Sequence, residues 1–350
     1  MIRKSPRTPI IAIVTMCLTL PACTRDDPSD TAPKLPGDGP TSKYNVIDTR
    51  TDQVDLARAK QNVEDTLTKY PQIDCLVGLW AYNGPAILSA VKDAGLHGKV
   101  IIVCFDEEVD VLRGIIDGHI EGTIVQQPYE FGYQCVRMLA SVARGDRSVI
   151  PEDRVMEVPV KVIESAPDAS AYLKHLATLQ GDFDAAGVAP ADADVMPVRL
   201  SFISNAAADF WRYAQVGVRH AEREFNAECD FHMPTGDPAA EQRRFVETAI
   251  ARKLDGLAIS PIDSANQIGM INEAAKVMPV FCHDSDAADS DRMCYVGTNN
   301  YKAGHEAGKL IKQALPDGGD IMIFVGKLDA QNAIERRQGI IDELNDVPMP

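Results

Sequence analysis

The sequence predicts an α/β protein built from two Rossmann-like lobes. Strand-like and helix-like segments alternate along most of the chain, their lengths are typical of βαβ units, and the two halves carry similar motifs in the same order. Alternation of this kind indicates parallel sheets that are covered by helices on both faces. We therefore expect two such sheets, joined by a hinge.

The composition is that of a folded globular protein. The chain has 350 residues, a length that suggests two domains, with 45% hydrophobic and 25% charged residues. Its formal net charge of -16 argues against a nucleic-acid partner, because binding phosphates requires a basic face. Beyond the N-terminal region, no segment of the sequence is long and apolar enough to span a bilayer.

Residues 1–23 have the features of an export signal. Three basic residues precede an apolar segment, Pro9–Leu20, that is too short for a stable transmembrane helix. The signal ends in Leu-Pro-Ala-Cys, which resembles a bacterial lipobox and predicts acylation of the Cys23 thiol. The alternative is an ordinary secretory cleavage site with an incidental cysteine. Residues 24–43, rich in Pro, Asp, Ser and Thr, are expected to form a disordered tether.

The alternation of strands and helices begins after this tether. The first predicted helix has Leu56, Val63 and Leu67 on one face, as expected for a helix that covers a sheet. In chain order, the predicted elements are strand 44–48, helix 54–70, strand 75–79, helix 84–94, strand 100–104, helix 109–117, strand 122–125 and helix 129–143.

A linker and a second series of elements follow. Residues 166–197 are predicted to form the linker, with a helix at Ala169–Leu179 and then a stretch rich in Ala, Asp and Pro. The alternation resumes with a strand that begins at Val198 and a helix that begins at Phe210. Later predicted elements are helix 301–314, strand 320–325 and helix 330–344.

Six cysteines lie beyond the signal, and they show no CxxC pair or other metal-ligand spacing. Several lie inside apolar strand-like runs, which predicts buried free thiols rather than disulfides. They are Cys75, Cys104, Cys135, Cys229, Cys282 and Cys294.

The two halves repeat a motif. Ile73–Gly78 (IDCLVG) matches Leu254–Ile259 (LDGLAI), and each segment begins a strand that is followed by a polar loop and a helix. Each then leads to a second strand with a similar end, VCFD closing at Asp106 and FCHD closing at Asp284. A repeat of this kind indicates two lobes of one design.

Asp106 and Asp284 therefore follow equivalent strands, one in each lobe. Ligands of open parallel sheets bind at the carboxyl ends of the strands, so we expect the loops at these ends to converge on one cleft. The two tryptophans, Trp80 and Trp211, lie in such loops. A ring face beside Asp, Asn, Arg and Gln suits a sugar, whose C–H face stacks on the ring while its hydroxyls form hydrogen bonds.

These residues also have simpler interpretations. An Asp after a strand is often the N-cap of the next helix. Phe210 and Trp211 could likewise be the first core-facing turn of a helix. The equivalent positions of the two aspartates in the repeat favour a binding site.

The chain resembles the periplasmic sugar-binding proteins of the ribose-binding type, which are the type I solute-binding proteins of ABC transporters. The resemblance covers residues 44–163 and 198–344 and implies the type I periplasmic binding protein fold. The motifs that carry it are LVGLWAYNGPAIL, IVCFDEE, IVQQPYEFG, SNAAADFW, DGLAISPIDSANQ, PVFCHDSDA, YVGTNNYKAG and IFVGKLDAQNAIERRQG.

The resemblance also implies which residues bind the ligand. The aromatic pair that clamps the sugar in that family corresponds to Phe210 and Trp211, and Ser285 stands where the family often has an arginine. With Trp80 added from its position in a loop, the predicted ligand-binding residues are Trp80, Asn83, Asp106, Gln126, Asn205, Phe210, Trp211, Asp284 and Arg336.

The order of the parts differs from that of the family. Residues 44–163, which correspond to the last part of the family, here precede Val198, which corresponds to its beginning. The chain is therefore predicted to be circularly permuted, with 166–197 joining the usual termini. One lobe would consist of residues 44–126 and 299–350, and the other of residues 127–165 and 198–298. Tyr44–Asp48 should then pair in parallel with Asp320–Val325.

The resemblance implies a lipoprotein of the periplasm or cell surface that captures a monosaccharide between its lobes and delivers it to an ABC permease. A sensing subunit that presents the sugar to a membrane receptor or kinase would have the same features, so both remain open. We expect a monomer that is held at the membrane by lipid alone, with no metal and no cofactor.

Two other classes of protein fit less well. An enzyme is disfavoured because the sequence has no GxSxG, P-loop or HExxH motif, and the aspartates after His283 lack EF-hand spacing and predict a solvated loop. A sugar-responsive repressor shares the two-lobed fold, but the export signal and the absence of a basic helix-turn-helix segment argue against it.

Overall fold

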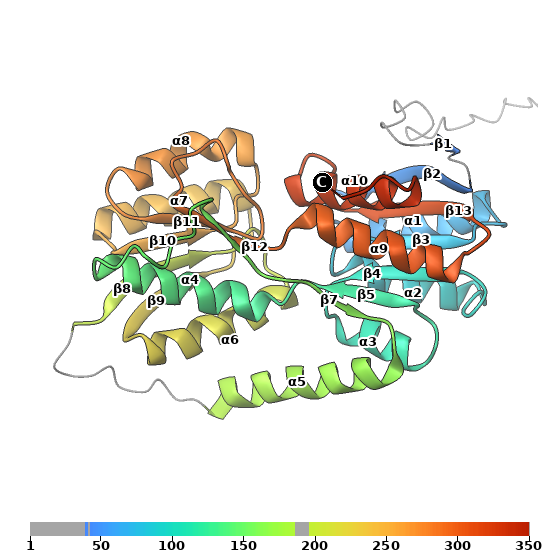
Figure 1. Ribbon diagram of the computed structural model, residues 1–350, viewed down its shortest axis with the longest axis horizontal. Coiled ribbons are helices and arrows are strands. Elements are labelled where there is room, and N and C mark those ends of the chain that lie inside the picture. The colour runs from blue at the N-terminus through green and yellow to red at the C-terminus, as the bar shows by residue number, and fades with distance from the viewer. Residues whose placement is uncertain (1–38, 41–42, 186–195, 350) are drawn as a thin grey trace, which may run out of the picture. The chain divides into compact units, whose positions relative to one another are not determined.

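The computed structural model describes residues 39–40, 43–185 and 196–349. These residues form two mainly parallel sheets with helices on both faces, as predicted (Figure 1). Cys23 and the predicted signal lie outside the described residues. Gly39 and Pro40, within the predicted tether, instead pair with the edge of the first sheet as strand β1.

The first sheet has the order β1-β2-β13-β3-β4-β5-β7. Its inner pairs are parallel, and the edge strands β1 and β7 pair in the antiparallel direction. The strands are β1 (Gly39–Pro40), β2 (Tyr44–Thr51), β3 (Cys75–Gly78), β4 (Ile101–Phe105), β5 (Gly122–Val125), β7 (Lys161–Ile163) and β13 (Gly319–Val325).

Two hydrophobic cores lie on opposite faces of the first sheet. Side chains alternate along a strand, so Leu76 of β3 packs in one core while its neighbours Cys75 and Val77 pack in the other. Helices α1 (Leu56–Lys69), α2 (Asn83–Asp93), α3 (Val109–Ile116) and α5 (Ala166–Ala185) cover the first face, and α9 (Asn300–Ala314) and α10 (Gln331–Leu344) cover the second.

The second sheet has the order β6-β12-β11-β10-β8-β9, and all its pairs are parallel. Its strands are β6 (Val155–Glu157), β8 (Val198–Ile203), β9 (Ala227–His232), β10 (Gly256–Ile259), β11 (Val280–His283) and β12 (Cys294–Gly297). Helices α4 (Pro128–Ala143) and α6 (Asp209–Glu224) cover one face, and α7 (Pro238–Arg252) and α8 (Ser264–Ala275) cover the other.

The predicted pairing of Tyr44–Asp48 with Asp320–Val325 is confirmed. Strand β2 runs parallel to β13, from Tyr44 opposite Gly319 to Thr51 opposite Val325. Strand β2, near the start of the described chain, therefore lies beside β13, its last strand. The predicted surface proximity of Thr41 and Pro350 concerns residues outside the described part of the chain.

Two boundaries differ from the prediction. We expected residues 127–165 to belong to the second lobe, but β7 (Lys161–Ile163) pairs with β5 of the first sheet. This pairing satisfies the open edge of β5, so the chain returns to the first sheet after β6. Helix α5 spans Ala166–Ala185 rather than Ala169–Leu179, and it packs against α3.

The chain crosses between the two sheets four times, and three of these crossings lie entirely within the described residues. They connect β5 to α4, β6 to β7, and β12 to α9. Gln127, in the first crossing, has a left-handed backbone and donates from Nε2 to the carbonyl oxygen of Pro159, in the second, at 2.6 Å. The Val158 amide donates to the carbonyl oxygen of Gly297, next to the third crossing, at 2.8 Å. Hydrogen bonds thus link all three crossings.

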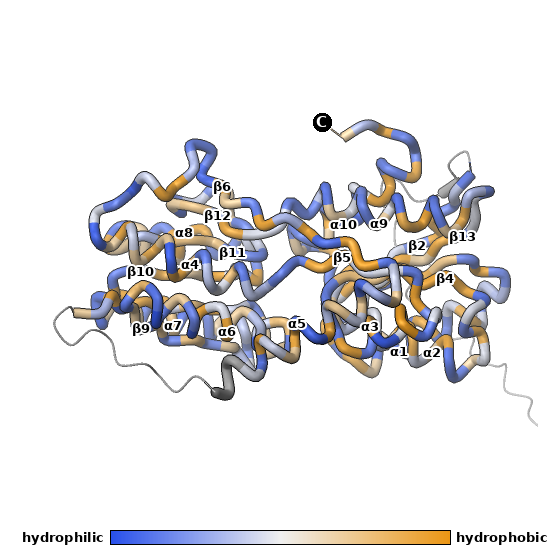
Figure 2. The backbone as a smooth tube through the Cα atoms, turned by 60° about the horizontal axis from the view of Figure 1, so that its bottom comes forward, coloured by the Kyte–Doolittle hydropathy of each residue, from blue (hydrophilic) through white to orange (hydrophobic). Residues whose placement is uncertain are grey.

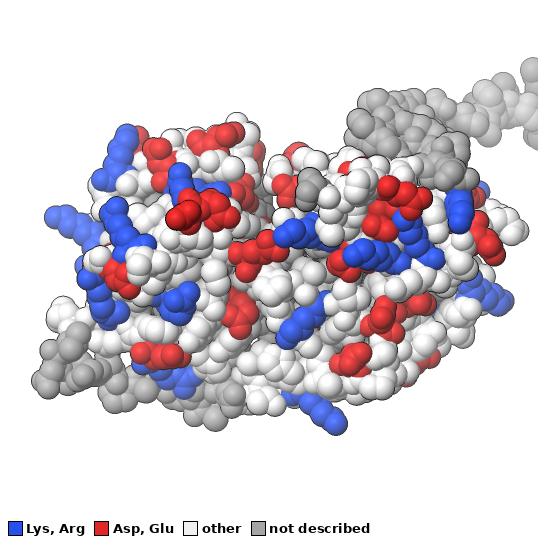
Figure 3. Space-filling view, viewed as in Figure 1, with Lys and Arg blue, Asp and Glu red and all other residues white. Residues whose placement is uncertain are grey.

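Hydrophobic residues concentrate in the strands, as Figure 2 shows for both sheets. The six cysteines beyond the signal are buried and free, which confirms the predicted thiols. Acidic and basic side chains are interspersed on the face shown in Figure 3. Across the described ranges, no helix has the length and apolar character needed to cross a membrane.

Candidate ligand-binding site

Asp284 follows β11 and accepts hydrogen bonds from two neighbouring loops. Ser260 Oγ, directly after β10, donates to Asp284 Oδ2 at 3.0 Å, and Asn205 Nδ2, after β8, donates to the same oxygen at 3.2 Å. The three loops meet because parallel strands end at one edge of a sheet. Trp211 Nε1 donates to Asn205 Oδ1 at 3.1 Å, so the start of α6 joins this network.

Asp106 occupies the corresponding position in the first sheet. It follows β4, and its Oδ1 accepts a hydrogen bond from Gln126 Nε2 at 2.6 Å. Gln126 directly follows β5, the neighbouring strand. The structure therefore brings together two of the predicted ligand-binding residues, which are 20 positions apart.

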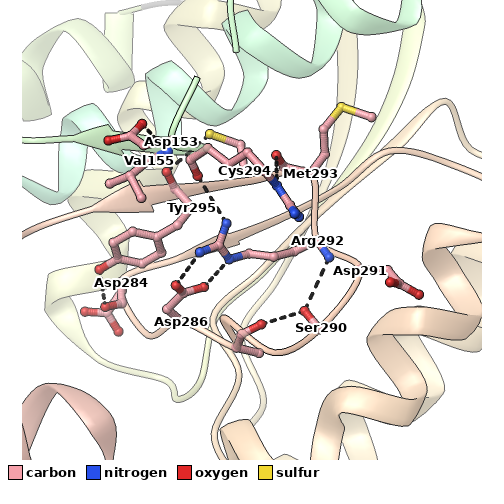
Figure 4. Close-up of polar contacts among 12 residues, drawn as sticks. Asp153, Val155, Asp284, Asp286, Ser290, Asp291, Arg292, Met293, Cys294 and Tyr295 are labelled. Carbon is pink, nitrogen blue, oxygen red and sulfur yellow. Dashed lines mark hydrogen bonds and ion pairs between the residues drawn. The ribbon is translucent and has the colours of Figure 1, made fainter. Parts of the chain in front are cut away.

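Asp106 and Asp284 share an unusual backbone conformation. Their φ angles are +70° and +59°, in the left-handed region that non-glycine residues seldom adopt and that concentrates at ligand clamps. The second residue of the next strand donates its hydroxyl to each backbone carbonyl, Thr123 to Asp106 at 2.7 Å and Tyr295 to Asp284 at 2.8 Å (Figure 4). The internal repeat thus extends to the geometry of the site.

Neither aspartate is a helix N-cap. The residue that precedes α3 is Glu108, and β11 is followed by β12 without an intervening helix. The simpler interpretation of these two residues is therefore excluded by the structure.

Arg336, on α10, contacts residues that lie near Asp106 and Asp284 in the structure. Its side chain is 1% exposed, donates from Nε to Asn300 Oδ1 at 2.9 Å and from Nη1 to the carbonyl oxygen of Leu79 at 2.7 Å. The guanidinium also lies 4.8 Å from the centre of the Phe105 ring. Its Nη2 is buried and has no hydrogen-bond partner among the described residues, and the same is true of Gln126 Oε1.

Burial dominates the ionisation of both aspartates. It raises the pKa of Asp284 to about 6, against the opposing effects of the Arg336 charge and of the hydrogen bonds from Ser260 and Asn205. Burial likewise raises the pKa of Asp106, again opposed by Arg336 and by the hydrogen bond from Gln126. One arginine therefore acts on carboxylates that belong to both sheets.

The two aromatic residues after β8 pack inside their own lobe. Trp211 is 2% exposed and meets the His283 ring edge-on at 5.3 Å between centroids, while Phe210 lies 6.1 Å from the Phe131 ring. These contacts match the interpretation of a core-facing helical turn. The role of Phe210 and Trp211 as a sugar clamp stays a prediction.

Trp80 and Asn83 are held by contacts within the first lobe. Asn83 Oδ1 accepts the backbone amide of Trp80 at 3.0 Å, and its Nδ2 donates to Asp52 Oδ2 at 3.1 Å. Trp80 Nε1 donates to Asn332 Oδ1 at 3.2 Å. Both polar atoms of the Asn83 amide are thus used to shape the loop, and its direct contact with a ligand stays a prediction.

A cavity of about 420 Å³ adjoins Asp284. It is lined by strands β6 and β12, by the loops after β11 and β12, and by the N-terminal turns of α9 and α10. Of the predicted ligand-binding residues, Asp284 lines it, together with Val155, Glu157, Ser285, Asp286, Tyr295, Thr298, Asn299, Asn300, Tyr301, Gln331, Asn332 and Glu335. Ser260 and Asn300 are not among the predicted ligand-binding residues, although Ser260 directly follows β10 and Asn300 lies close to the end of β12, and strand ends are where binding residues are found.

The acidic run after His283 is more ordered than the predicted solvated loop. Arg292 pairs with Asp286 through two nitrogens, and its Nη2 lies 2.6 Å from Asp286 Oδ2 (Figure 4). The His283 ring is buried and stacks on Phe202 at 4.0 Å, and burial lowers its pKa to about 3. Within the described part of the chain, no group of three or more His, Cys, Asp and Glu side chains is arranged to hold a metal ion.

Known proteins show which family this arrangement belongs to. Residues 34–147 and 200–349 match the periplasmic binding protein domain family. The chain is 26% identical over 107 residues to the ribose import binding proteins RbsB of Salmonella typhimurium and Escherichia coli, and the match covers 30% of this chain and 35% of each relative. The chain thus matches about a third of the length of these relatives.

Solved structures show similar chains. A solute-binding protein of an ABC transporter from Burkholderia graminis, solved with D-arabinose, is 28% identical with a TM-score of 0.42, over 44% of this chain and 54% of that one. GanP, a glucose-galactose binding protein from Geobacillus stearothermophilus, is 28% identical with a TM-score of 0.41, over 43% and 54%. From the extent of the family match, which covers well over half of its residues, the chain belongs to the periplasmic binding protein family.

Proposed function

We propose that this protein binds a monosaccharide reversibly and delivers it to an ABC permease. The observation that carries the proposal is the pair of equivalent aspartates, Asp106 and Asp284, each of which follows a strand and has a left-handed backbone conformation. The charge of Arg336 favours the ionised form of both carboxylates. Carboxylates, a guanidinium and amide groups suit the hydroxyls of a sugar, because they accept and donate several hydrogen bonds in fixed directions.

The composition of the site favours binding over catalysis. His283 is buried against Phe202 and has a lowered pKa, so it is not placed to exchange protons with a ligand at neutral pH. Family membership and the curated relatives, which are named as ribose import binding proteins, support the same interpretation.

A thermal-shift screen tests the sugar ligand. The protein without its signal is heated at pH 7.5 with each of a series of pentoses and hexoses, beginning with D-ribose, D-arabinose, D-xylose and D-glucose. A sugar present at 100 times its Kd should stabilise the protein by about 2.7 kcal/mol and raise Tm by a few degrees. The sugar should be recovered unchanged. No shift with any monosaccharide, or conversion of one of them, would contradict the proposal.

Delivery to a permease is tested in cells. Deletion of the gene should abolish uptake of the radiolabelled sugar that gives the largest thermal shift. Growth-phase or transcriptional responses to that sugar, with uptake unchanged, would favour a sensing role instead.

We also propose that the mature protein is anchored through lipid on Cys23. A Cys23→Ser variant should leave the membrane fraction and appear in the soluble extracytoplasmic fraction, because a protein without acyl chains has no anchor in this proposal. The matched control is Cys17→Ser, which changes the other cysteine of the predicted signal and should leave the distribution unchanged. Equal membrane association of both variants would contradict lipid anchoring at Cys23.

A further inference from the structure

Gln242 lies on α7, behind the loops that surround Asp284. Its side chain is 0% exposed, and its amide makes hydrogen bonds with both loops. Nε2 donates to the backbone carbonyl oxygens of Ser204 at 2.9 Å and Ser260 at 2.7 Å. One side chain therefore joins the loop after β8 to the loop after β10.

The acceptor side of the same amide is also used. Gln242 Oε1 accepts from Gln267 Nε2 at 2.8 Å and from the Ile262 backbone amide at 3.4 Å. Gln267 Oε1 in turn accepts the backbone amide of Asp263 at 3.2 Å. Two buried glutamines thus hold successive residues of the loop after β10, and Gln267 fixes the orientation of the Gln242 amide.

Both carbonyl groups that accept from Gln242 lie at or next to a residue that donates a hydrogen bond to Asp284. Ser260 donates its own hydroxyl to Asp284 Oδ2, and Ser204 directly precedes Asn205, the other donor to that oxygen. Gln242 makes no contact with Asp284 itself among the hydrogen bonds of the described chain. Its effect on Asp284 must therefore pass through the two loops.

We propose that Gln242 is a positioning residue, which fixes the loops after β8 and β10 so that Ser260 and Asn205 can hold the Asp284 carboxylate for a ligand. Gln is suited to this role because a neutral amide offers two donors to two carbonyls and one acceptor to an N–H group. Leu, Met or Glu at this position cannot donate to both carbonyls. That Asp284 contacts a sugar rests on the proposed function, whereas its positioning does not.

The experiment measures the pKa of Asp284 in the protein without sugar. Carboxyl carbon resonances are followed by NMR across pH 4 to 8, and the Asp284 signal is identified by its loss in Asp284→Asn. Gln242→Met should raise the pKa of Asp284 by about 0.5 unit or more, because weaker hydrogen bonds from Ser260 and Asn205 stabilise the ionised carboxylate less.

Val246→Ala is the matched control. Val246 lies one turn further along α7 and is buried at 1% exposure, so its truncation weakens the packing of the same helix without removing a loop contact. The pKa of Asp284 should stay unchanged in this variant even where the loss of Tm equals that of Gln242→Met. An equal change in both variants, or no change in Gln242→Met, overturns the proposal.

Gln267→Met provides the same comparison if Gln242→Met does not fold. It removes the donor that orients Gln242 and leaves both carbonyl contacts possible, so a smaller rise in the pKa of Asp284 is expected, and no rise overturns the proposal. Because the measurement needs no sugar, it succeeds or fails independently of the thermal-shift screen. A protein that binds no monosaccharide but shows the predicted pKa changes would retain the positioning role and lose the proposed function.

Discussion

Asp284 shows how a single buried residue can oppose stability. Its carboxyl group is buried, which raises its pKa to about 6. Hydrogen bonds from Ser260 and Asn205 and the charge of Arg336 favour the ionised form. A carboxylate with a raised pKa is destabilised in its ionised form by the fold, yet that form is the one that accepts hydrogen bonds from hydroxyls. Such a cost is expected where a site is prepared for a ligand rather than for folding.

This cost predicts how stability depends on pH. Because the folded pKa of Asp284 lies above its usual value, its favourable contribution is complete below about pH 4 and is lost as the pH rises through about 6. Asp284→Asn mimics the protonated form. The free energy of unfolding of the variant, relative to the parent, should therefore rise by ~2–3 kcal/mol between pH 4 and pH 7, as measured by urea unfolding without sugar.

Asp289→Asn is the control for this pH dependence. Asp289 lies in the same acidic segment but is exposed, so its replacement removes one charge without relieving a buried one. Between pH 4 and pH 7, the free energy of unfolding of this variant should differ from that of the parent by a constant amount. If the free energy of unfolding of Asp284→Asn also differed from that of the parent by a constant amount across this pH range, burial would not raise the pKa of Asp284.

The two aspartates should contribute similarly to sugar binding. Asp106→Ala or Asp284→Ala should weaken the affinity for the sugar found in the thermal-shift screen by about 1–3 kcal/mol, because a sugar hydroxyl or Arg336 loses its partner. Calorimetric titration at pH 7.5 measures the loss. Asp289→Ala is again the exposed control, and unchanged affinity in both site variants would remove Asp106 and Asp284 from the binding site.

At the scale of elements, the two lobes use the same close helix packing. In the second lobe, a Cβ on Gly132 of α4 would lie 2.0 Å from the carbonyl oxygen of Ala214 on α6, and one on Gly217 of α6 would lie 2.0 Å from that of Tyr129. In the first lobe, a Cβ on Gly304 of α9 would likewise lie 2.2 Å from the carbonyl oxygen of Arg336 on α10. Each pair of helices therefore approaches backbone to backbone at glycine.

The close approach in the first lobe also positions Arg336. Gly339 lies one turn after it on α10, where a Cβ would be 2.2 Å from the carbonyl oxygen of Tyr301. Gly339→Ala must separate α9 from α10, which should lower the free energy of unfolding by about 1–3 kcal/mol and weaken sugar binding through displacement of Arg336. Urea unfolding and calorimetry measure the two effects.

Gly269→Ala is the matched control for this packing. Gly269 lies inside α8, and a Cβ there would meet no atom within 4 Å. The substitution should stabilise the protein by about 0.4–1 kcal/mol, since alanine restricts the unfolded chain without a clash. If Gly339→Ala were stabilising to the same extent, the helices would not be in the close contact described.

At the scale of the whole molecule, the position of β2 bears on the order of the chain. Strand β2 lies parallel to β13, and α10 follows β13, so β13, α10 and β2 occupy the places of a strand, a helix and the next parallel strand. In an uninterrupted chain such elements are joined by a short connection with a right-handed crossover. The circular permutation predicted from the order of the motifs is an inference that this arrangement fits, and it stays a prediction.

A rearranged chain tests this inference. It begins at Val198, continues through Pro350 into Lys43 by way of a short glycine-serine linker, and ends at Ile163, without the linker segment that contains α5. The rearranged protein should keep the same far-ultraviolet circular dichroism and bind the same sugar with an affinity within about tenfold, because permutation at a surface loop preserves the contacts of the native state.

Loss of α5 could itself alter this rearranged chain, since α5 contributes Ala169, Tyr172 and Leu176 to a core of the first lobe. A second chain that retains residues 164–185 after Ile163 is the control. Failure of both chains to fold would contradict the permutation, whereas folding of the second chain alone would assign the difference to α5.

Local sequence patterns were enough to predict the class of fold and most of its elements. Alternating apolar runs and amphipathic helices are local signals, and the predicted segments agree to within a few residues with β2, α1, β3, α2, β4, α3, β5 and α4, whereas α5 extends beyond its predicted bounds. The internal repeat also placed Asp106 and Asp284 at equivalent positions, because both are fixed by their distance from a strand end.

Which groups act on one another depends on the assembled fold. The return of β7 to the first sheet depends on an open edge at β5, and the contact of Arg336 with Leu79 and Asn300 joins segments far apart in the sequence. Gln242 had no sequence signal of its own, since a buried glutamine is recognised by the carbonyls that it reaches. Local pattern specifies where a strand or helix forms, but hydrogen-bond partners and pKa values depend on distances that exist only after the sheets have been assembled.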